Sequence, residues 1–222
     1  MIRALIFDFD GVILETEEPI YRSWVEVYEA HGELLPFEKW IQTVGSTNAL
    51  FHPQHHLEER LGAPLPKDVL DRRVARRTAL VLEQRVLPGV VELIDGARAA
   101  GARVGVASSS TSDWVAGHLA RLGILERFDC LRCRDHVANA KPAPDLYLSA
   151  LECLGVESSD AIAIEDSPNG IAAAKRAGMR CVAIPNRITM RLDLAQADLV
   201  LSSLAGLSFA LLRDRLDRQD AG

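Results

Sequence analysis

The chain has 222 residues, of which 48% are hydrophobic and 25% are charged, a composition typical of a globular protein. Its 25 basic and 31 acidic residues leave a formal net charge of −6, with histidine counted as neutral. Such a chain lacks the overall positive field that attracts nucleic acid or an anionic membrane surface. We therefore expect neither of these partners.

Apolar runs in the sequence are short, as at 104–107 and 161–164. A membrane helix needs about 20 apolar residues, so no membrane span is predicted. Asp8 and Asp10 interrupt the apolar N-terminus, which argues against a targeting segment. We expect a soluble protein of the cytoplasm.

Four cysteines are present, at positions 130, 133, 153 and 181. Cys130 and Cys133 form one CxxC pair, but no second pair follows at a spacing that suits zinc. A chain of this length can build a core without disulfides. We therefore expect thiols in a reducing compartment.

The first predicted element is a buried strand that starts at Arg3 and terminates at Asp10-Gly11. From about Glu15 to Arg85 the spacing of apolar residues is helical, and no strand is predicted. One helix places Ile20, Trp24, Val27, Tyr28 and His31 on a single face, and others are predicted at 48–61 and 67–86. We expect an all-helical cap domain at 15–86, inserted into a core domain formed by 1–14 and 87–222.

After residue 86, helical and strand patterns alternate. Strands are predicted at 103–107, 161–164, 181–184 and 199–201, and helices at 90–100, 112–122, 144–154 and 168–177. This alternation predicts an α/β fold, a Rossmann-like parallel sheet with helices on both faces. The polar end, from Asp214 to Gly222, is expected to fray.

Four of the predicted strand ends and loops are unusually polar. They carry Asp8 and Asp10, then Ser108-Ser109-Ser110, then Lys141, then Glu165-Asp166. Each alone has a structural explanation as a turn, a helix cap or an exposed lysine. Ligands bind beyond the carboxyl ends of parallel strands, however, so four such segments at one edge indicate a site.

These segments resemble the motifs of the haloacid dehalogenase superfamily, in the subfamily with a helical cap that includes the β-phosphoglucomutase-like phosphatases. The motifs are DFDGVI at 8–13, VASSS at 106–110, AKPAPDLY at 140–147 and IEDSPNG at 164–170. The resemblance is strong in the core and weak in the cap.

The resemblance implies a role for each motif residue. Asp8 would be the nucleophile that attacks phosphorus, and Asp10 the general acid and base, with its carbonyl on the metal. Ser108 would bind the phosphoryl group, Lys141 would neutralise charge, and Glu165 and Asp166 would complete the metal site. Converging carboxylates repel one another unless a hard cation compensates, and oxygen ligands suit Mg²⁺.

The cap should choose the substrate. We assign substrate binding to Ser109, Gly45 and Asn48. By count, the cap histidine of the mutases falls on Ile20 and their cap-loop arginine on Asn48. Both departures favour hydrolysis over phosphate transfer within a sugar.

A predicted cap helix carries four arginines at i and i+4 spacing, Arg72, Arg73, Arg76 and Arg77. They form either a solvated face paired with Asp68, Asp71 and Glu83 or a surface that steers anions to the cleft. The tryptophans Trp24, Trp40 and Trp114 are expected to serve packing.

The sequence therefore predicts a Mg²⁺-dependent phosphatase of small phosphorylated metabolites, with sugar phosphates as the expected class, acting as a monomer or homodimer. A β-phosphoglucomutase-type mutase is the enzymatic alternative. A non-catalytic homologue that binds a phosphorylated ligand or a protein is the alternative from another class.

Overall fold

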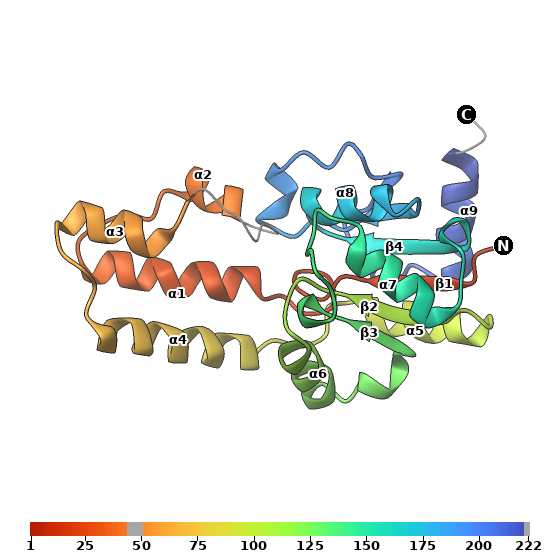
Figure 1. The fold of residues 1–222 in the computed structure, drawn as a ribbon, viewed down its shortest axis with the longest axis horizontal. Coiled ribbons are helices and arrows are strands. Elements are labelled where there is room, and N and C mark those ends of the chain that lie inside the picture. Colours follow the sequence, from red (N-terminus) through yellow and green to blue (C-terminus); the bar gives the residue numbers. More distant parts are fainter. Residues whose placement is uncertain (44–50, 220–222) are drawn as a thin grey trace.

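A single parallel sheet forms the centre of the protein, whose computed structural model describes residues 1–43 and 51–219 (Figure 1). Its strands lie in the order β3-β2-β1-β4-β5-β6. They are β1 (Ala4–Phe7), β2 (Arg103–Ala107), β3 (Cys130–Arg132), β4 (Ala161–Glu165), β5 (Arg180–Ala183) and β6 (Leu199–Val200). The predicted α/β fold with a Rossmann-like sheet is confirmed.

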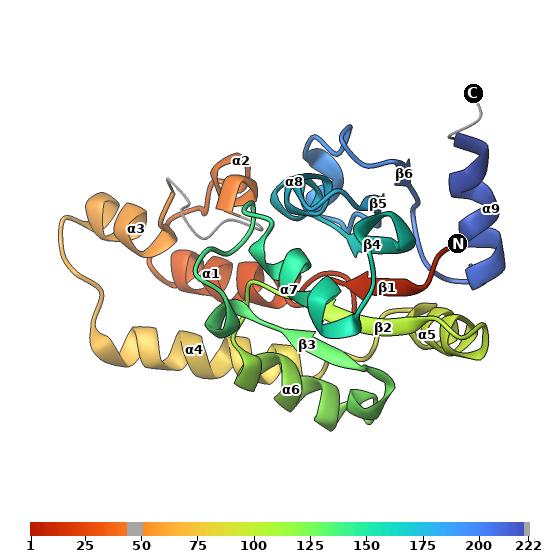
Figure 2. The same cartoon turned by 45° about the vertical axis from the view of Figure 1, so that its right-hand side comes forward.

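Helices cover both faces of this sheet (Figure 2). One face carries α5 (Val90–Ala99), α6 (Ser112–Arg121) and α9 (Phe209–Gln219), and the other carries α7 (Asp145–Leu154) and α8 (Pro168–Arg176). Short 3-10 turns lie at Ile41–Thr43, Leu125–Arg127, Arg134–His136, Ser158–Asp160 and Thr189–Arg191. Within the described part of the chain, none of the helices combines the length and apolar character that a membrane crossing demands.

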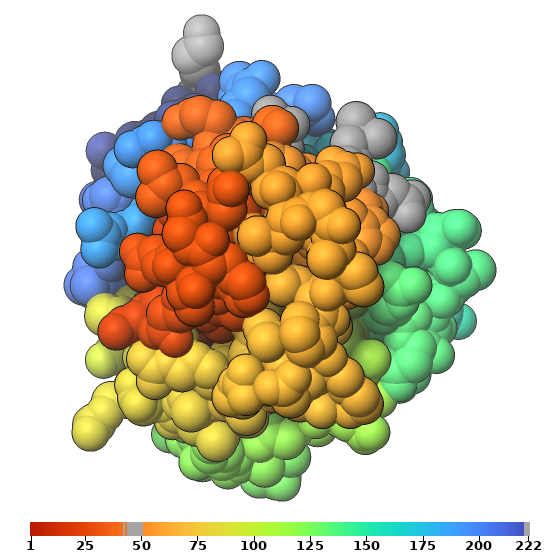
Figure 3. Space-filling model, turned by 90° about the vertical axis from the view of Figure 1, so that its left-hand side faces the viewer, coloured from red at the N-terminus to blue at the C-terminus, as the bar shows by residue number. Residues whose placement is uncertain are grey.

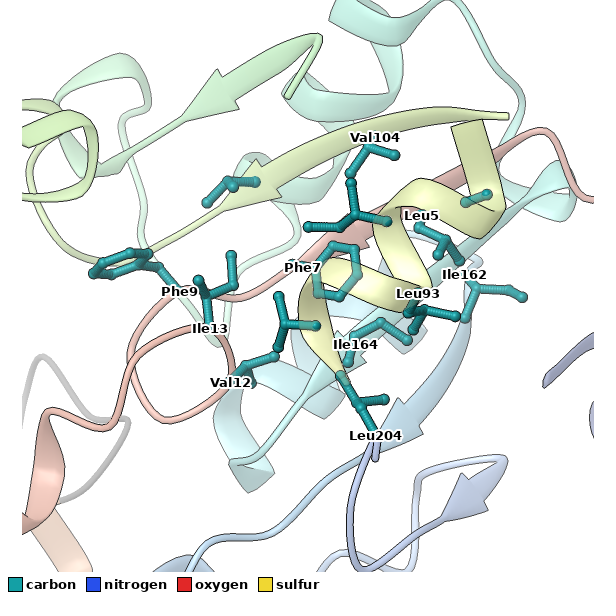
Figure 4. Close-up of a cluster of buried hydrophobic side chains, with 14 of the residues drawn as sticks. Leu5, Phe7, Phe9, Val12, Ile13, Leu93, Val104, Ile162, Ile164 and Leu204 are labelled. Atoms are coloured by element: carbon teal, nitrogen blue, oxygen red, sulfur yellow. The ribbon is translucent and has the colours of Figure 1, made fainter. Parts of the chain in front are cut away.

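The two faces of β1 have different packing. Leu5 and Phe7 point into a cluster with Leu93 of α5 and Ile164 of β4, shown in Figure 4. The alternate residues of β1 and β4, among them Ala4 and Ala163, face α7 and α8, where small side chains allow close approach. Every one of these residues is fully buried.

The order of the strands positions the site. β1 pairs with β2 on one side and with β4 on the other, and all the pairings are parallel. The direction of strand order reverses between β1 and β4, which is the switch point where open α/β sheets bind ligands. Residues after the carboxyl ends of these two strands therefore meet in one crevice.

Four helices lie beyond that edge of the sheet: α1 (Glu17–Ala30), α2 (Phe37–Trp40), α3 (Pro53–Leu61) and α4 (Lys67–Leu82). They pack around their own apolar cluster, which includes Trp24, Tyr28 and Leu57. Their side chains form the end of the molecule that faces the viewer in Figure 3. The segments that join them to the sheet meet at a bridge between Leu14 and Val86.

One strand was missed from the sequence, and the expectation that all four cysteines are thiols was wrong. The edge strand β3 was not predicted, because three residues that include Arg132 are too short and too polar to give a periodic pattern. Cys130 in β3 forms a disulfide with Cys153, so these two are not thiols. The reason is tertiary, since α7 packs across β2 and β3. Cys133 and Cys181 are free thiols, as expected, and both are buried.

The C-terminal segment also differs from its prediction. Residues 214–219, expected to fray, belong to α9. This helix is polar overall, but Phe209, Leu212 and Leu216 recur on one face and are buried against the core. Three apolar residues at helical spacing are therefore enough to hold a largely charged segment.

Candidate active site

The chain turns sharply after β1, and this turn presents two aspartates. The backbone N–H of Asp8 donates to the carbonyl of Ile164, which continues the parallel pairing one residue beyond the strand. Gly11 has a φ of 80°, and a Cβ there would overlap the carboxylate of Asp166. The close approach of the two loops thus requires glycine in the motif.

Asp8, Lys141, Glu165 and Asp166 meet at the floor of the crevice. Lys141 Nζ lies 2.8 Å from Asp8 Oδ1 and 2.6 Å from Glu165 Oε1. Lys141 is 3% exposed, Glu165 is fully buried, and Asp8 retains 8% of its accessible surface. The lysine is therefore held between two carboxylates, one of which still reaches the cavity.

Glu165 is the most constrained member of this group. Its Oε1 also accepts a hydrogen bond of 2.6 Å from Tyr147 Oη, and its Oε2 accepts from the backbone N–H of Asp166 at 3.2 Å. Gly170 in α8 has no side chain, and a Cβ at that position would overlap the Glu165 carboxylate. This environment orients Glu165 toward Lys141.

Charge and burial act against each other at this floor. Burial, reinforced by Glu165 and Asp10 and opposed by Lys141, raises the pKa of Asp8 to about 7. Burial also raises the pKa of Asp166 well above its usual value, with Asp8 and Glu165 adding to the effect. For Lys141, burial disfavours the charged form, but the two carboxylates outweigh it and its pKa is raised.

Asp10 lies in a separate network of hydrogen bonds. Its Oδ1 accepts from Thr16 Oγ1 at 2.8 Å and from the indole Nε1 of Trp114 at 3.1 Å. Its Oδ2 accepts from Ser110 Oγ at 2.6 Å. Three neutral donors thus fix this carboxylate in orientation without adding a charge.

The acidic group at the floor could hold a metal ion. One oxygen from each of Asp8, Glu165 and Asp166 lies within 4.8 Å of the others. When all three carboxylates are ionised, the single ammonium of Lys141 leaves two negative charges unbalanced. Oxygen donors with this excess of charge suit a hard divalent cation such as Mg²⁺.

A cavity of about 500 Å³ opens above this floor, within the size range of small-molecule sites. The core contributes Asp8, Asp10, Ser109, Ser110, Thr111, Trp114, Lys141, Asp166 and Ser167 to its walls, and the cap helices and the turn after α2 contribute Glu17, Ile20, Trp40, Thr43 and Arg77. Ser109 Oγ is buried and has no hydrogen-bond partner among the described residues. The cavity therefore lies between the sheet and the helices α1, α2 and α4.

Glu17 brings a further carboxylate from the start of α1 to this wall. Burial, followed by the charges of Asp10, Glu15 and Asp8, raises its pKa to about 8. Protonation of Glu17 is therefore easier than that of an exposed glutamate.

The sequence-predicted residues divide into three groups. Asp8, Lys141, Glu165 and Asp166 lie together, with Asp10 beside them. Ser108 is buried and accepts from the backbone N–H of Ser110, whereas Ser109 lines the cavity. Gly45 and Asn48 lie outside the described residues.

Several wall residues were missed from the sequence. Trp114 was expected only to pack, but its indole N–H binds Asp10. Ser110 was named only as part of the 108–110 segment, and Tyr147, which lies beside the floor and not in the cavity wall, only as part of a motif, since the partners of both are distant in sequence. Glu17 was not singled out. Glu17 could have been found by its place just after Thr16, at the junction of strand and cap.

Comparison with known proteins identifies the family. The sequence model described as haloacid dehalogenase-like hydrolase matches residues 2–178. The protein belongs to the haloacid dehalogenase-like hydrolases. Hexitol phosphatase B of Escherichia coli (strain K12) is similar, with 31% identity over 186 residues that cover 83% of this chain and 84% of that protein. YhcW of Bacillus subtilis (strain 168) is 42% identical over 221 residues, which cover 99% of this chain and 100% of the relative.

Among solved structures, CbbY from Rhodobacter sphaeroides in complex with phosphate is similar, with a TM-score of 0.74 and 34% identity. The match covers 96% of this chain and 100% of that one. A mutant of CbbY has also been solved with xylulose-(1,5)bisphosphate. The relatives in this family include phosphatases, and the present protein is a phosphatase of the haloacid dehalogenase-like hydrolases.

Proposed function

We propose that the protein hydrolyses the phosphate monoesters of small metabolites, with sugar phosphates as the substrate class, through a phosphorylated Asp8. The observation that carries this proposal is the position of Asp8, bound to Lys141 yet open to a cavity of metabolite size. The names of hexitol phosphatase B and of the CbbY complexes support the substrate class.

The cofactor in this proposal is Mg²⁺. Asp8, Asp166 and the backbone carbonyl of Asp10 would hold it, with Glu165 beside them. When bound, the ion would offset the charge of the carboxylates and polarise the phosphoryl oxygens. Because both oxygens of Glu165 already accept hydrogen bonds, we assign this residue chiefly to holding Lys141.

The first half of the proposed reaction transfers the phosphoryl group. Asp8 attacks phosphorus while the bond from phosphorus to the leaving oxygen breaks. Asp10 donates a proton to that oxygen, so the product leaves as an alcohol. Lys141 stabilises the charge that builds up, and the hydroxyls of Ser108 and Ser109 bind the phosphoryl oxygens.

The second half restores the enzyme. Asp10, now a carboxylate, accepts a proton from a water molecule that attacks phosphorus. The bond between Asp8 and phosphorus breaks, which releases inorganic phosphate. Hydrolysis rather than mutase activity is supported by Ile20, whose apolar side chain lines the cavity at the counted position of the mutase histidine.

We further propose that residues 15–86 act as a cap over the core formed by 1–14 and 87–222. The cap helices have an apolar cluster of their own, and Glu17, Ile20 and Arg77 close the cavity from that side. Substrate choice would then depend on cap side chains, and chemistry on core side chains.

The test is phosphate release from a panel of phosphorylated metabolites, with and without Mg²⁺, with Asp8→Asn as the blank. We expect Mg²⁺-dependent release that the Asp8→Asn protein lacks, although its melting temperature stays near that of wild type. Interconversion of hexose 1- and 6-phosphates would favour a mutase. No release from any compound, p-nitrophenyl phosphate included, would favour a non-catalytic binding protein.

A further inference from the structure

Four arginines of α4 differ in what they contact. Arg72 forms an ion pair of 2.7 Å with Asp68 on the same helix, and both side chains are exposed. Arg76 forms an ion pair of 2.9 Å with Glu26 of α1. These two arginines therefore belong to a surface network that joins the helices of the cap.

Arg73 and Arg77 have no acidic partner among the described residues. The guanidinium of Arg73 lies over the ring of Trp24, 4.5 Å from its centroid. That of Arg77 lies over Trp114, 5.6 Å from the centroid, and its buried Nε has no hydrogen-bond partner in the described chain. Residues 44–50 contain no acidic residue in sequence that could pair with either arginine.

Leaving these two cations unpaired is costly. Burial lowers the pKa of Arg73 to about 10, with the nearby charge of Arg77 as the second cause. Like charges one helical turn apart destabilise a helix, and a partly buried guanidinium without a partner loses the hydrogen bonds that water would give it. An anion bound at Arg77 would offset the repulsion between the two arginines and would accept hydrogen bonds from the Arg77 guanidinium.

The position of Arg77 in the cavity suggests where that anion comes from. Lys141 and Arg77 are the two cations among the described cavity walls, and Lys141 is already bound to Asp8 and Glu165. The indole of Trp114 donates to Asp10 and carries Arg77 on its ring. One indole ring therefore separates the reaction centre from an unpaired guanidinium.

We propose that Arg77 determines specificity by binding a second anionic group of the substrate, a phosphate or a carboxylate remote from the phosphate that is cleaved. A guanidinium matches either group because it can donate two parallel hydrogen bonds. The inference rests on the proposed function and narrows its substrate class to sugar bisphosphates and phosphorylated acids. The residue that binds this anion would lie on α4, whereas the position counted for the cap-loop arginine of the mutases is occupied by Asn48.

The test uses two substrate pairs that differ at the remote end. Fructose 1,6-bisphosphate is compared with fructose 6-phosphate, and 3-phosphoglycerate with glycerol 3-phosphate, by kcat/KM. We expect wild type to favour the member with two anionic groups in at least one pair, and the pair that shows this preference tells whether the second group is a phosphate or a carboxylate. Arg77→Gln should lower that preference about 10- to 100-fold, the usual value of a charge-assisted contact. Arg77→Lys should recover part of it.

Arg72→Gln is the matched control, because it removes an arginine of the same helix that lies outside the cavity, and its preference should equal that of wild type. Equal losses by Arg77→Gln on both members of each pair, or no wild-type preference, would overturn the inference. Calorimetric titration of the same compounds into Asp8→Asn, with and without Arg77→Gln, gives a readout without turnover. If no compound is hydrolysed, the proposed function fails, and the inference stands or falls on whether Arg77→Gln selectively weakens binding of the compounds with two anionic groups.

Discussion

Asp8 and Asp10 are two residues apart, yet their surroundings differ enough to support the separate tasks that we propose for them. Asp8 is bound to an ammonium and grouped with two further carboxylates, whereas Asp10 accepts only from neutral donors. Pairs of acids in unlike environments commonly divide nucleophilic and acid-base roles. Trp114 contributes to this division, because its N–H binds the same Asp10 oxygen as Thr16.

Trp114→Phe removes this hydrogen bond and keeps an aromatic ring. Hydrogen bonds to charged groups are worth about 1.5–3 kcal/mol, so we expect kcat to fall about 10-fold or more. The measurement is steady-state phosphate release under saturating Mg²⁺. Trp24→Phe, which alters a cap tryptophan outside the cavity, is the control and should retain wild-type kcat. Equal kcat for Trp114→Phe and wild type would remove Trp114 from the orientation of Asp10.

Gly170, like Gly11, occupies a position where the site leaves no room for a side chain. Gly170→Ala would press a methyl group against Glu165, and overpacking of this kind costs about 1–3 kcal/mol of unfolding free energy. Gly117→Ala in α6 is the matched change, since its Cβ would meet no described heavy atom within 4 Å. We expect it to stabilise the protein by about 0.5–1 kcal/mol. Thermal melts should therefore shift in opposite directions, and a shared direction would contradict the packing described for Glu165.

Sequence reasoning found the residues that lie in local motifs and missed those that depend on contacts between distant segments. Asp8, Lys141 and Asp166 were predictable because each follows a strand or precedes a helix in a recognisable pattern. Arg77 was recognised only as one of four arginines, since its separate role depends on where Trp114 lies. No local pattern in the sequence reports that distance.

At the scale of elements, prediction succeeded where periodicity was strong. β1, β2 and β4 are short buried apolar runs, and α5 to α8 end near glycines or charged turns, so their order could be derived. β3 and the C-terminal part of α9 were missed. Both are dominated by polar residues and are held by a few buried side chains, which only the assembled core explains.

Adjacent leucines of α9 test this explanation. Leu212 is fully buried, whereas Leu211 is 36% exposed. Leu212→Ala should lower the unfolding free energy by about 2–4 kcal/mol, because it leaves a cavity in the core. Leu211→Ala should cost less than about 1 kcal/mol. Urea denaturation measures both, and similar small losses would mean that α9 does not pack as described.

At the scale of the whole molecule, the fold places the two sides of the cavity on different parts of the chain. The carboxyl ends of β1 and β4 supply the acidic floor, and helices inserted after β1 supply the wall that faces it. The insertion itself was predictable from a long helical stretch within an alternating pattern. Its placement over the floor was not, because it depends on how α1 and α4 pack together and on the two connections near Leu14 and Val86.

The central claim is that Asp8 carries the phosphoryl group. The most direct measurement is to quench the enzyme during turnover with Mg²⁺ and a hydrolysed substrate, treat it with hydroxylamine, and map the peptide that contains Asp8 by mass spectrometry. An acyl phosphate at Asp8 converts to a hydroxamate, so we predict this modification at Asp8 alone, and its loss when Mg²⁺ is removed with EDTA. Unmodified Asp8 in an enzyme that is releasing phosphate would contradict the account.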